Sequence, residues 1–272
     1  MKVLLGLCAL WMLARSGTAM DAASQACALF VRSVLPGLFP YMTVALMAVS
    51  RVSAPVPGWA VILLGWGGGS PTGARLISRT PGASGKRTAV CCATMSPMFL
   101  AGTLGGWLQS ARAGACLLTA VLAGGYVASL TVPAGERIVS NPAPEPPSAP
   151  LRLGQAVETA ARTMLMVCGT MVMMRVMSSL VSELLHGLPT LSLVLTTLLE
   201  VTTGTSAIAQ LPLPLALRTA LMAAATGFGG AAVILQNRAV YPAYLISLPE
   251  QLLWQALHAG LSFLIALALM LL

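Results

Sequence analysis

The sequence predicts an all-α polytopic membrane protein. Of its 272 residues, 57% are hydrophobic and only 8% are charged, whereas roughly a quarter of an ordinary soluble domain is charged. Several apolar runs approach the roughly 20 residues that a helix needs to cross a bilayer. Because lipid offers no partners to unpaired backbone groups, helices are the expected form of these spans.

The formal net charge of +8 could suggest a nucleic-acid partner. The basic residues, however, are scattered singly between apolar runs, and the aromatic residues form no stacking platform. We therefore expect no nucleic-acid partner and interpret the charge as a guide to membrane topology. The six cysteines lie in apolar stretches without CxxC spacing, which favours buried thiols over disulfides or a metal site.

The chain before residue 133 divides into an N-terminal segment, 1–20, and a first unit, 21–132. The segment has a basic start, an apolar core and small residues at its end, so it suits a transmembrane helix or a secretory signal. We favour a retained helix because membrane segments follow it. In order, the first unit should contain an interfacial helix over 21–34, a span over 35–50, a short apolar segment over 59–66, a span over 89–108 interrupted by Ser96-Pro97, and a span over 113–132.

A proline-rich, polar segment over 133–151 predicts an extended connection outside the bilayer. The second unit covers 152–272. In order, it should contain an amphipathic lead-in over 152–162, a span over 163–185, a short apolar segment over 191–199, a span over 213–235 broken by GFGG, and a span over 251–272.

The two units match in the order of their parts. Ser70 and Ser96 are 26 residues apart, and so are Gly204 and Gly230. We assume that each short segment returns to its own side of the membrane and that residue 1 is cytoplasmic. Ten Lys and Arg residues are then cytoplasmic, and only four lie outside. The four outside residues are Arg15, Arg32, Arg112 and Arg218. The units then cross in opposite directions. Inverted repeats with broken helices are typical of secondary transporters, whose substrate site lies where the halves meet.

The glycine-rich motifs predict re-entrant helical hairpins and broken helices. Gly67–Gly69 permit a sharp turn, Ser70 could cap the next helix, and Pro71 suits its first position. The helix would present free N–H groups to an anion. We expect the breaks to converge on one cavity, although glycines could instead serve close helix packing. The candidate substrate-binding residues are Gly68, Gly69, Ser70, Thr72, Gly73, Thr94, Ser96, Glu200, Thr202, Thr203, Gly204, Thr205, Gly229 and Gly230.

Two ionisable residues at membrane depth are candidates for function. Glu200 could bind a coupling cation, carry a proton, hold a substrate, or simply bond the amides of its own hairpin. Arg175 could attract a carboxylate, but structural pairing with Glu200 or Glu183 is favoured.

Other polar residues have more ordinary interpretations. Gln236 and Asn237 could line the cavity or end a helix, and His186 and His258 are expected at the interface. A serine nucleophile at Ser96 or Ser206 would lack a His–acid context, so we expect no enzyme. No metal or cofactor is expected beyond a coupling proton or sodium ion.

Five motifs resemble the sporulation integral membrane proteins of the YlbJ type, which carry the nucleoside-recognition or gate domain. They are SVLPGLFPYMTV (33–44), GGGSPTGARL (67–76), SPMFLAGTLG (96–105), LLEVTTGT (198–205) and GFGGAAVILQ (227–236). The resemblance implies a fold like that of concentrative nucleoside transporters. It also implies transport of dipicolinate in endospore-forming bacteria, in the mother-cell-derived membrane around the forespore. The first tip, Gly68–Pro71, lacks the aromatic residue that is common in the family. At the second tip, Thr205 occupies the position where the family often has Cys.

The physical pattern alone leaves several functions open. Dipicolinate is a small planar dianion, and helix N-termini with hydroxyl groups favour carboxylates. A nucleoside or another small solute would fit a polar lining without the positive helix ends. A non-transport scaffold of spore envelope assembly is a further alternative, and the sequence leaves open whether the chain forms a homo-oligomer.

Overall fold

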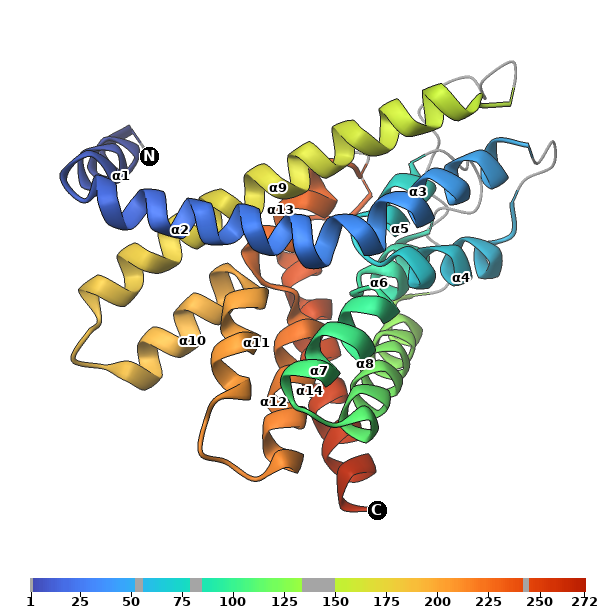
Figure 1. Cartoon of the computed structure of the whole chain (residues 1–272). Helices are drawn as coiled ribbons and strands as arrows, with labels where there is room; N and C mark the ends of the chain where they lie inside the picture. Colours follow the sequence, from blue (N-terminus) through green and yellow to red (C-terminus); the bar gives the residue numbers. More distant parts are fainter. Residues whose placement is uncertain (1, 52–55, 79–84, 134–149, 242–244) are drawn as a thin grey trace.

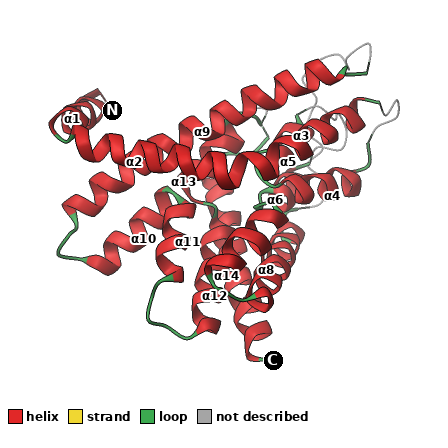
Figure 2. Cartoon of the chain, in the orientation of Figure 1, coloured by secondary structure: helices red, strands yellow, loops and turns green. Residues whose placement is uncertain are grey.

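The computed structural model describes residues 2–51, 56–78, 85–133, 150–241 and 245–272. In this part of the chain every regular element is a helix (Figure 2). Five helices are long and apolar enough to cross a membrane: Ser16–Ser50, Ala111–Leu130, Leu153–Leu184, Leu215–Arg238 and Leu248–Leu271. These helices support the prediction of an all-α, multi-pass membrane protein. The predicted connection falls almost wholly on 134–149, outside the described residues.

The first helices differ from the sequence prediction. Helix α1 (Lys2–Ala14) ends before residue 20, and α2 (Ser16–Leu29), the π-helical turn η1 (Phe30–Val34) and α3 (Leu35–Ser50) follow as one continuous helical stretch. The predicted separation of an interfacial helix from a span at residue 34 is therefore wrong. Pro36 cannot donate to the carbonyl of Arg32, and the wider π turn just before it accommodates the missing bond without ending the helix.

Both predicted short segments form helical hairpins, and both predicted interruptions occur. The first hairpin is α4 (Gly58–Gly68) with α5 (Thr72–Ile77), and the second is α10 (Pro189–Leu199) with α11 (Val201–Ala209). The first broken helix consists of α6 (Lys86–Cys92), η2 (Met98–Leu104) and α7 (Gly105–Trp107), and the second of α12 (Leu215–Phe228) and α13 (Gly230–Arg238).

Three uninterrupted helices complete the fold: α8 (Ala111–Leu130), α9 (Leu153–Leu184) and α14 (Leu248–Leu271). The lead-in predicted over 152–162 is not separate, because no helix-breaking residue stands between it and the span, and α9 runs through both. At its start the Arg152 N–H donates to Gln155 Oε1 over 2.9 Å. Ser247 and Glu250 form a capping box at the start of α14.

The helices form two packed groups. In Figure 1, α2, α3 and α9 lie side by side across the top of the view, while α8, α12 and α14 pack together below them. Close approach in the lower group depends on a glycine in α8: a Cβ added at Gly124 would lie only 2.5 Å from Ser262 Oγ of α14. Small residues at helix crossings are the usual means of close packing in membranes.

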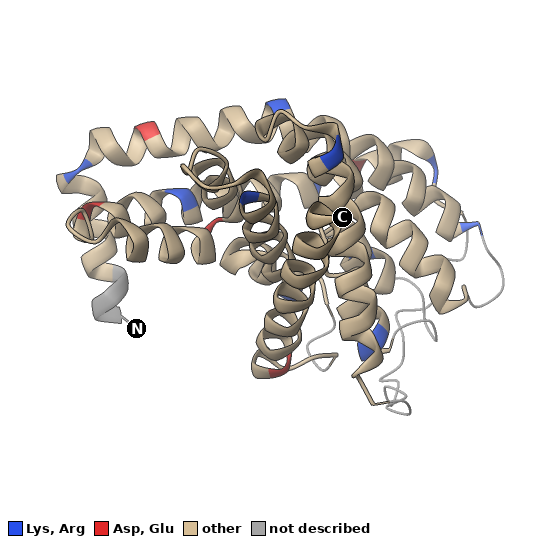
Figure 3. Ribbon diagram, turned by 90° about the horizontal axis from the view of Figure 1, so that it is seen from below, with Lys and Arg blue, Asp and Glu red and all other residues tan. Residues whose placement is uncertain are grey.

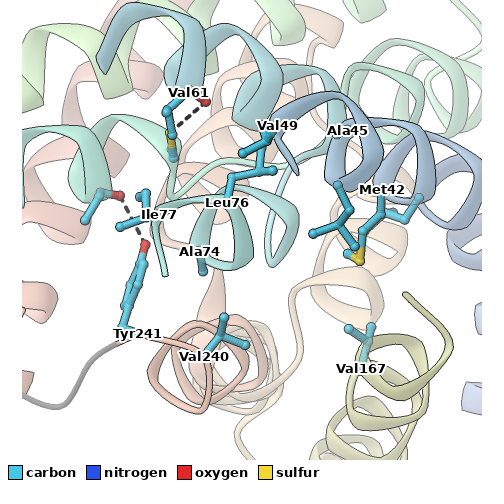
Figure 4. Close-up of a cluster of buried hydrophobic side chains, with 14 of the residues drawn as sticks. Met42, Ala45, Val49, Val61, Ala74, Leu76, Ile77, Val167, Val240 and Tyr241 are labelled. Carbon is cyan, nitrogen blue, oxygen red and sulfur yellow. Dashed lines mark hydrogen bonds between the residues drawn. The ribbon is translucent and has the colours of Figure 1, made fainter. Parts of the chain in front are cut away.

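A hydrophobic cluster holds the first hairpin in place. Met42, Val61 and Leu76 are fully buried where α3, α4 and α5 meet, and Val167 of α9 faces the same cluster (Figure 4). Tyr241, after α13, donates its hydroxyl to the Ala89 carbonyl of α6 over 3.2 Å. The hairpin is therefore packed against residues of both halves of the chain.

The few charged residues lie mainly toward helix ends (Figure 3). Arg87 donates to the Ser129 and Leu130 carbonyls at the C-terminal end of α8. Arg112, at the other end of α8, donates to the Leu269 carbonyl. Since a 20-residue helix is about 30 Å long, these two arginines lie about a bilayer thickness apart.

Candidate functional site

Glu200 forms the tip of the second hairpin. It is only 3% exposed, and its carboxylate accepts hydrogen bonds from the N–H groups of Thr202 (2.9 Å) and Thr203 (2.6 Å). The Thr203 hydroxyl donates to the same carboxylate over 2.6 Å. Glu200 thus caps α11, which is the structural alternative that the sequence left open.

The tip of the first hairpin is packed against the first helix break. The Ser70 N–H donates to the Thr94 carbonyl over 2.6 Å, and a Cβ at Gly69 would overlap the backbone nitrogen of Ser96. Gly69 has φ +64°, a backbone conformation that favours glycine. Ser70, Thr72, Thr94 and Ser96 are all buried here. This part of the predicted site is therefore tightly packed.

Each hairpin tip meets the broken helix of its own half, and a hydrogen bond from the second half reaches the first tip. In the second half, a Cβ at Gly230 would lie 3.2 Å from the Leu198 carbonyl at the end of α10. Across the halves, Asn237 Nδ2 of α13 donates to Ser70 Oγ over 3.1 Å. Asn237 therefore faces the first tip from within the protein, in the last turn of α13.

The prediction that the tips present free N–H groups to an anion is wrong for this conformation. At the first tip, the amides of Thr72 and Gly73 both donate to the Gly69 carbonyl. At the second tip, the Glu200 carboxylate takes the amides that an anion would need. Ser70 does not cap α5, because its oxygen accepts from Asn237 instead. Ser96 does cap, since its Oγ accepts from the Phe99 N–H over 3.3 Å.

A cleft of about 530 Å³, with a largely apolar surface and several polar lining residues, lies between α2, α9, α11 and α7. Its lining includes residues of the predicted site together with polar residues on the facing helices. The polar lining residues are Gln25, Arg175, Glu200, Thr202, Thr203, Ser206 and Gln210. A cleft of this volume is in the range that holds small-molecule ligands.

Arg175 is the cationic residue of this cleft, and its partner is neutral. It lies within the apolar helix α9, and its Nη2 donates to Gln25 Oε1 of α2 over 2.7 Å. The predicted ion pairs with Glu200 and Glu183 are not formed among the described residues, because Glu183 binds Arg15 and Trp11 instead. No carboxylate in the described part of the chain thus contacts the Arg175 guanidinium directly.

The cleft gathers only part of the predicted site. Glu200, Thr202 and Thr203 line it with Arg175, whereas the first tip, the first break and the Gly229–Gly230 break are not among its lining residues. The expected convergence of all four interruptions on one cavity is not what the described residues show. The reason is the packing of each tip against its own broken helix.

A row of buried polar side chains on α14 was not predicted. Gln251, Gln255, His258 and Ser262 recur every three or four residues, which places them on one face of the helix. All four are buried. The expectation that His258 is interfacial is wrong: it is 1% exposed, and its Nε2 lies 2.8 Å from the Val121 carbonyl. The helical spacing of these residues within an apolar span was the signal that could have identified them.

No protein-family model, curated protein or solved structure matches the chain.

Proposed function

We propose that the protein is a membrane carrier for a small carboxylate. The observation that carries the proposal is Arg175, a cation within an apolar helix that faces this cleft and is bonded to a neutral amide. Ionisable groups within membrane helices are costly and usually serve function. An anion in the cleft would supply the charge that Gln25 does not.

The rest of the lining suits the same class of ligand. Arginine binds carboxylates in a two-pronged arrangement, and the hydroxyls of Thr203 and Ser206 lie on the α11 side of the cleft. The Glu200 carboxylate is engaged by the N-terminus of α11, whose partial positive charge offsets it. Glu200 would then shape the binding region without itself holding the anion.

The carrier would work as two inverted halves, 21–132 and 152–272. Each half has a long first helix, a helical hairpin, a broken helix and a closing span, in that order. Rocking of one half against the other around the Ser70–Asn237 contact would expose the cleft alternately to the two sides. A coupling proton or sodium ion belongs to the same proposal.

Dipicolinate is the first substrate to test, because the resemblance described above implies it. With that substrate, the protein would act during sporulation, in the mother-cell-derived membrane around the forespore. Its planar ring with two carboxylates is small enough for a cleft of about 530 Å³.

Uptake of labelled dipicolinate by proteoliposomes tests the proposal. We expect uptake by the unaltered protein and a loss of about tenfold or more in Arg175→Gln, because a hydrogen bond to a charged group contributes about 1.5–3 kcal/mol. Arg175→Lys should keep part of the activity, because it keeps the charge.

The matched control is Arg162→Gln. Arg162 lies on the same helix, is exposed and pairs with Glu158, so its loss should leave uptake unchanged. Uptake that is equal in Arg175→Gln and Arg162→Gln would contradict the role of the cleft. Folded protein that moves neither dipicolinate nor other small carboxylates would favour a scaffold of envelope assembly, and uptake of nucleosides alone would favour a nucleoside carrier.

A further inference from the structure

The buried polar face of α14 contains side chains without protein partners. Gln251 and Gln255 are 3% and 4% exposed. Neither the nitrogen nor the oxygen of either side-chain amide has a hydrogen-bond partner among the residues that the structure describes. Buried amides normally have partners, because an unpaired donor or acceptor loses its bonds to water without compensation.

Two comparable buried side chains are bonded, although Ser262 Oγ of α14 and Asn237 Oδ1 also lack a partner among the described residues. Gln236 is equally buried at 3%, yet its Nε2 donates to Thr170 Oγ1 over 2.8 Å. His258 Nε2 is bonded to the Val121 carbonyl, and because a carbonyl only accepts, this nitrogen carries the proton and Nδ1 is left as an acceptor in the neutral ring. The two glutamines of α14 differ from these two side chains, because both polar atoms of each amide lack a partner in the described part of the chain.

The two amides line a small, partly open space between α14 and the first broken helix. Its other lining residues are Ala89, Val90, Ala93, Tyr241, Ile246, Trp254 and His258. The space available to the centre of a water molecule is about 10 Å³, which is enough for about one molecule. Gln255 also reaches the second break, since its Nε2 lies 3.8 Å from the position of a Cβ at Gly229.

We infer that Gln251, Gln255 and His258 form a binding site for water where α14 adjoins the breaks of both halves. Water fits the chemistry, because it is both donor and acceptor and the two amides and the imidazole offer both. It also fits the size, because a larger polar solute has no room. A buried water of this kind typically makes about three hydrogen bonds, and these side chains supply that number.

Water-edited NMR of the full chain in deuterated lipid bilayers tests the inference. With ¹⁵N-labelled glutamine side chains, magnetisation passes from water protons to nearby Nε2 groups. We expect Gln251 and Gln255 to gain signal as fast as Gln155, which is exposed at the start of α9, and Gln236 to gain it much more slowly. Gln251→Met and Gln255→Met, made one at a time, assign the two signals.

The inference is overturned if either Gln251 or Gln255 gains signal as slowly as Gln236. That result would mean that the amides are dry or bond one another. A second measurement uses the thermal midpoint of Gln255→Met, in which an apolar side chain of similar length replaces the amide. A raised midpoint would show that a dry, unpaired amide had been removed and would also overturn the inference, whereas an unchanged or lowered midpoint supports bound water. Neither measurement depends on transport.

Discussion

Two charged side chains at membrane depth are accommodated in different ways. The Glu200 carboxylate is buried but satisfied by two amides and a hydroxyl of its own hairpin. The Arg175 guanidinium, in contrast, has a neutral partner from another helix. Only the second arrangement leaves a charge that a ligand could balance. Both residues lie in apolar segments, so their hydrogen-bond partners, and not their surroundings in the sequence, distinguish them.

Glu200→Gln should destabilise the protein. A glutamine offers one acceptor oxygen where the carboxylate offers two, and it loses the favourable charge at the N-terminus of α11. We expect a loss of about 1 kcal/mol in the free energy of unfolding, measured by thermal unfolding in detergent. Glu158→Gln, at an exposed ion pair, should change it by less than about 0.5 kcal/mol. Equal effects would contradict the capping role.

Glycines are needed at the turn of the first hairpin and at the break of the second broken helix, but for different reasons. Gly69 lies where the first hairpin turns, with the backbone of Ser96 against the position of its missing side chain. Gly229 ends α12 with φ +81°, and the atoms nearest to a Cβ there are Cγ1 and Cβ of Val233, at 3.3 and 3.4 Å. The first position therefore requires glycine for space and conformation, and the second mainly for conformation.

Alanine substitutions should follow that order. Gly69→Ala should cost about 1–3 kcal/mol for overpacking and about 1–3 kcal/mol more for backbone strain. Gly229→Ala should cost about 1–2 kcal/mol, from its left-handed conformation. Gly169→Ala, in α9 with open space around it, should be neutral or slightly stabilising. Thermal midpoints measure the ranking, and a Gly69→Ala midpoint at or above that of Gly229→Ala would argue against the tight tip.

The pairing of α2 with α9 can be tested with native cysteines. Cys27 of α2 lies close to Cys168 of α9, and the two helices pack against one another. In a variant that keeps only these two, with a protease site inserted within 133–151, oxidation should join the two fragments. They should migrate together on a non-reducing gel and separate after reduction.

The control for this cross-link keeps Cys116 and Cys168 instead. Cys116 lies in α8, and α8 belongs to the lower helix group (Figure 1). This pair should stay unlinked under the same conditions. A link through Cys116 that formed as readily as the link through Cys27 would contradict the packing of α2 on α9.

At the scale of the whole molecule, the basic residues divide between two ends. Arg87 bonds the C-terminal end of α8, where Lys86 and Glu250 also form an ion pair of 2.9 Å. Arg112 lies at the opposite end, beside the end of α14. This separation is compatible with the predicted excess of basic residues on the cytoplasmic side.

Labelling should place Arg112 and Arg152 on opposite sides of the membrane. In a cysteine-free background, Arg112→Cys should react with a membrane-impermeant thiol reagent added to intact cells. Arg152→Cys should react only in inverted vesicles. Both positions are exposed in the structure, so failure to react would not come from burial. Reaction of both from the same side would contradict the predicted topology and the inverted repeats with it.

The helices and their interruptions could largely be predicted from the sequence, whereas the site could be predicted only in part. Gly229 and the Gly69–Pro71 turn end helices through local backbone chemistry. The boundary expected at Leu35 failed because a π turn carries the helix past Pro36. Arg175 and Glu200 stand out in the sequence as ionisable residues in apolar segments. The partner of Arg175, however, is 150 positions away in the sequence, whereas that of Glu200 is only three positions away.

The sequence by itself determined that this is a helical membrane protein with two hairpins and two broken helices, because composition, apolar run length and glycine or proline at turns act locally. Only the tertiary structure decided which polar groups meet. Arg175 faces Gln25, Ser70 faces Asn237, and the amides of α14 line a small space beside α6. Such contacts join distant segments, and they depend on how helices pack, which no local pattern specifies.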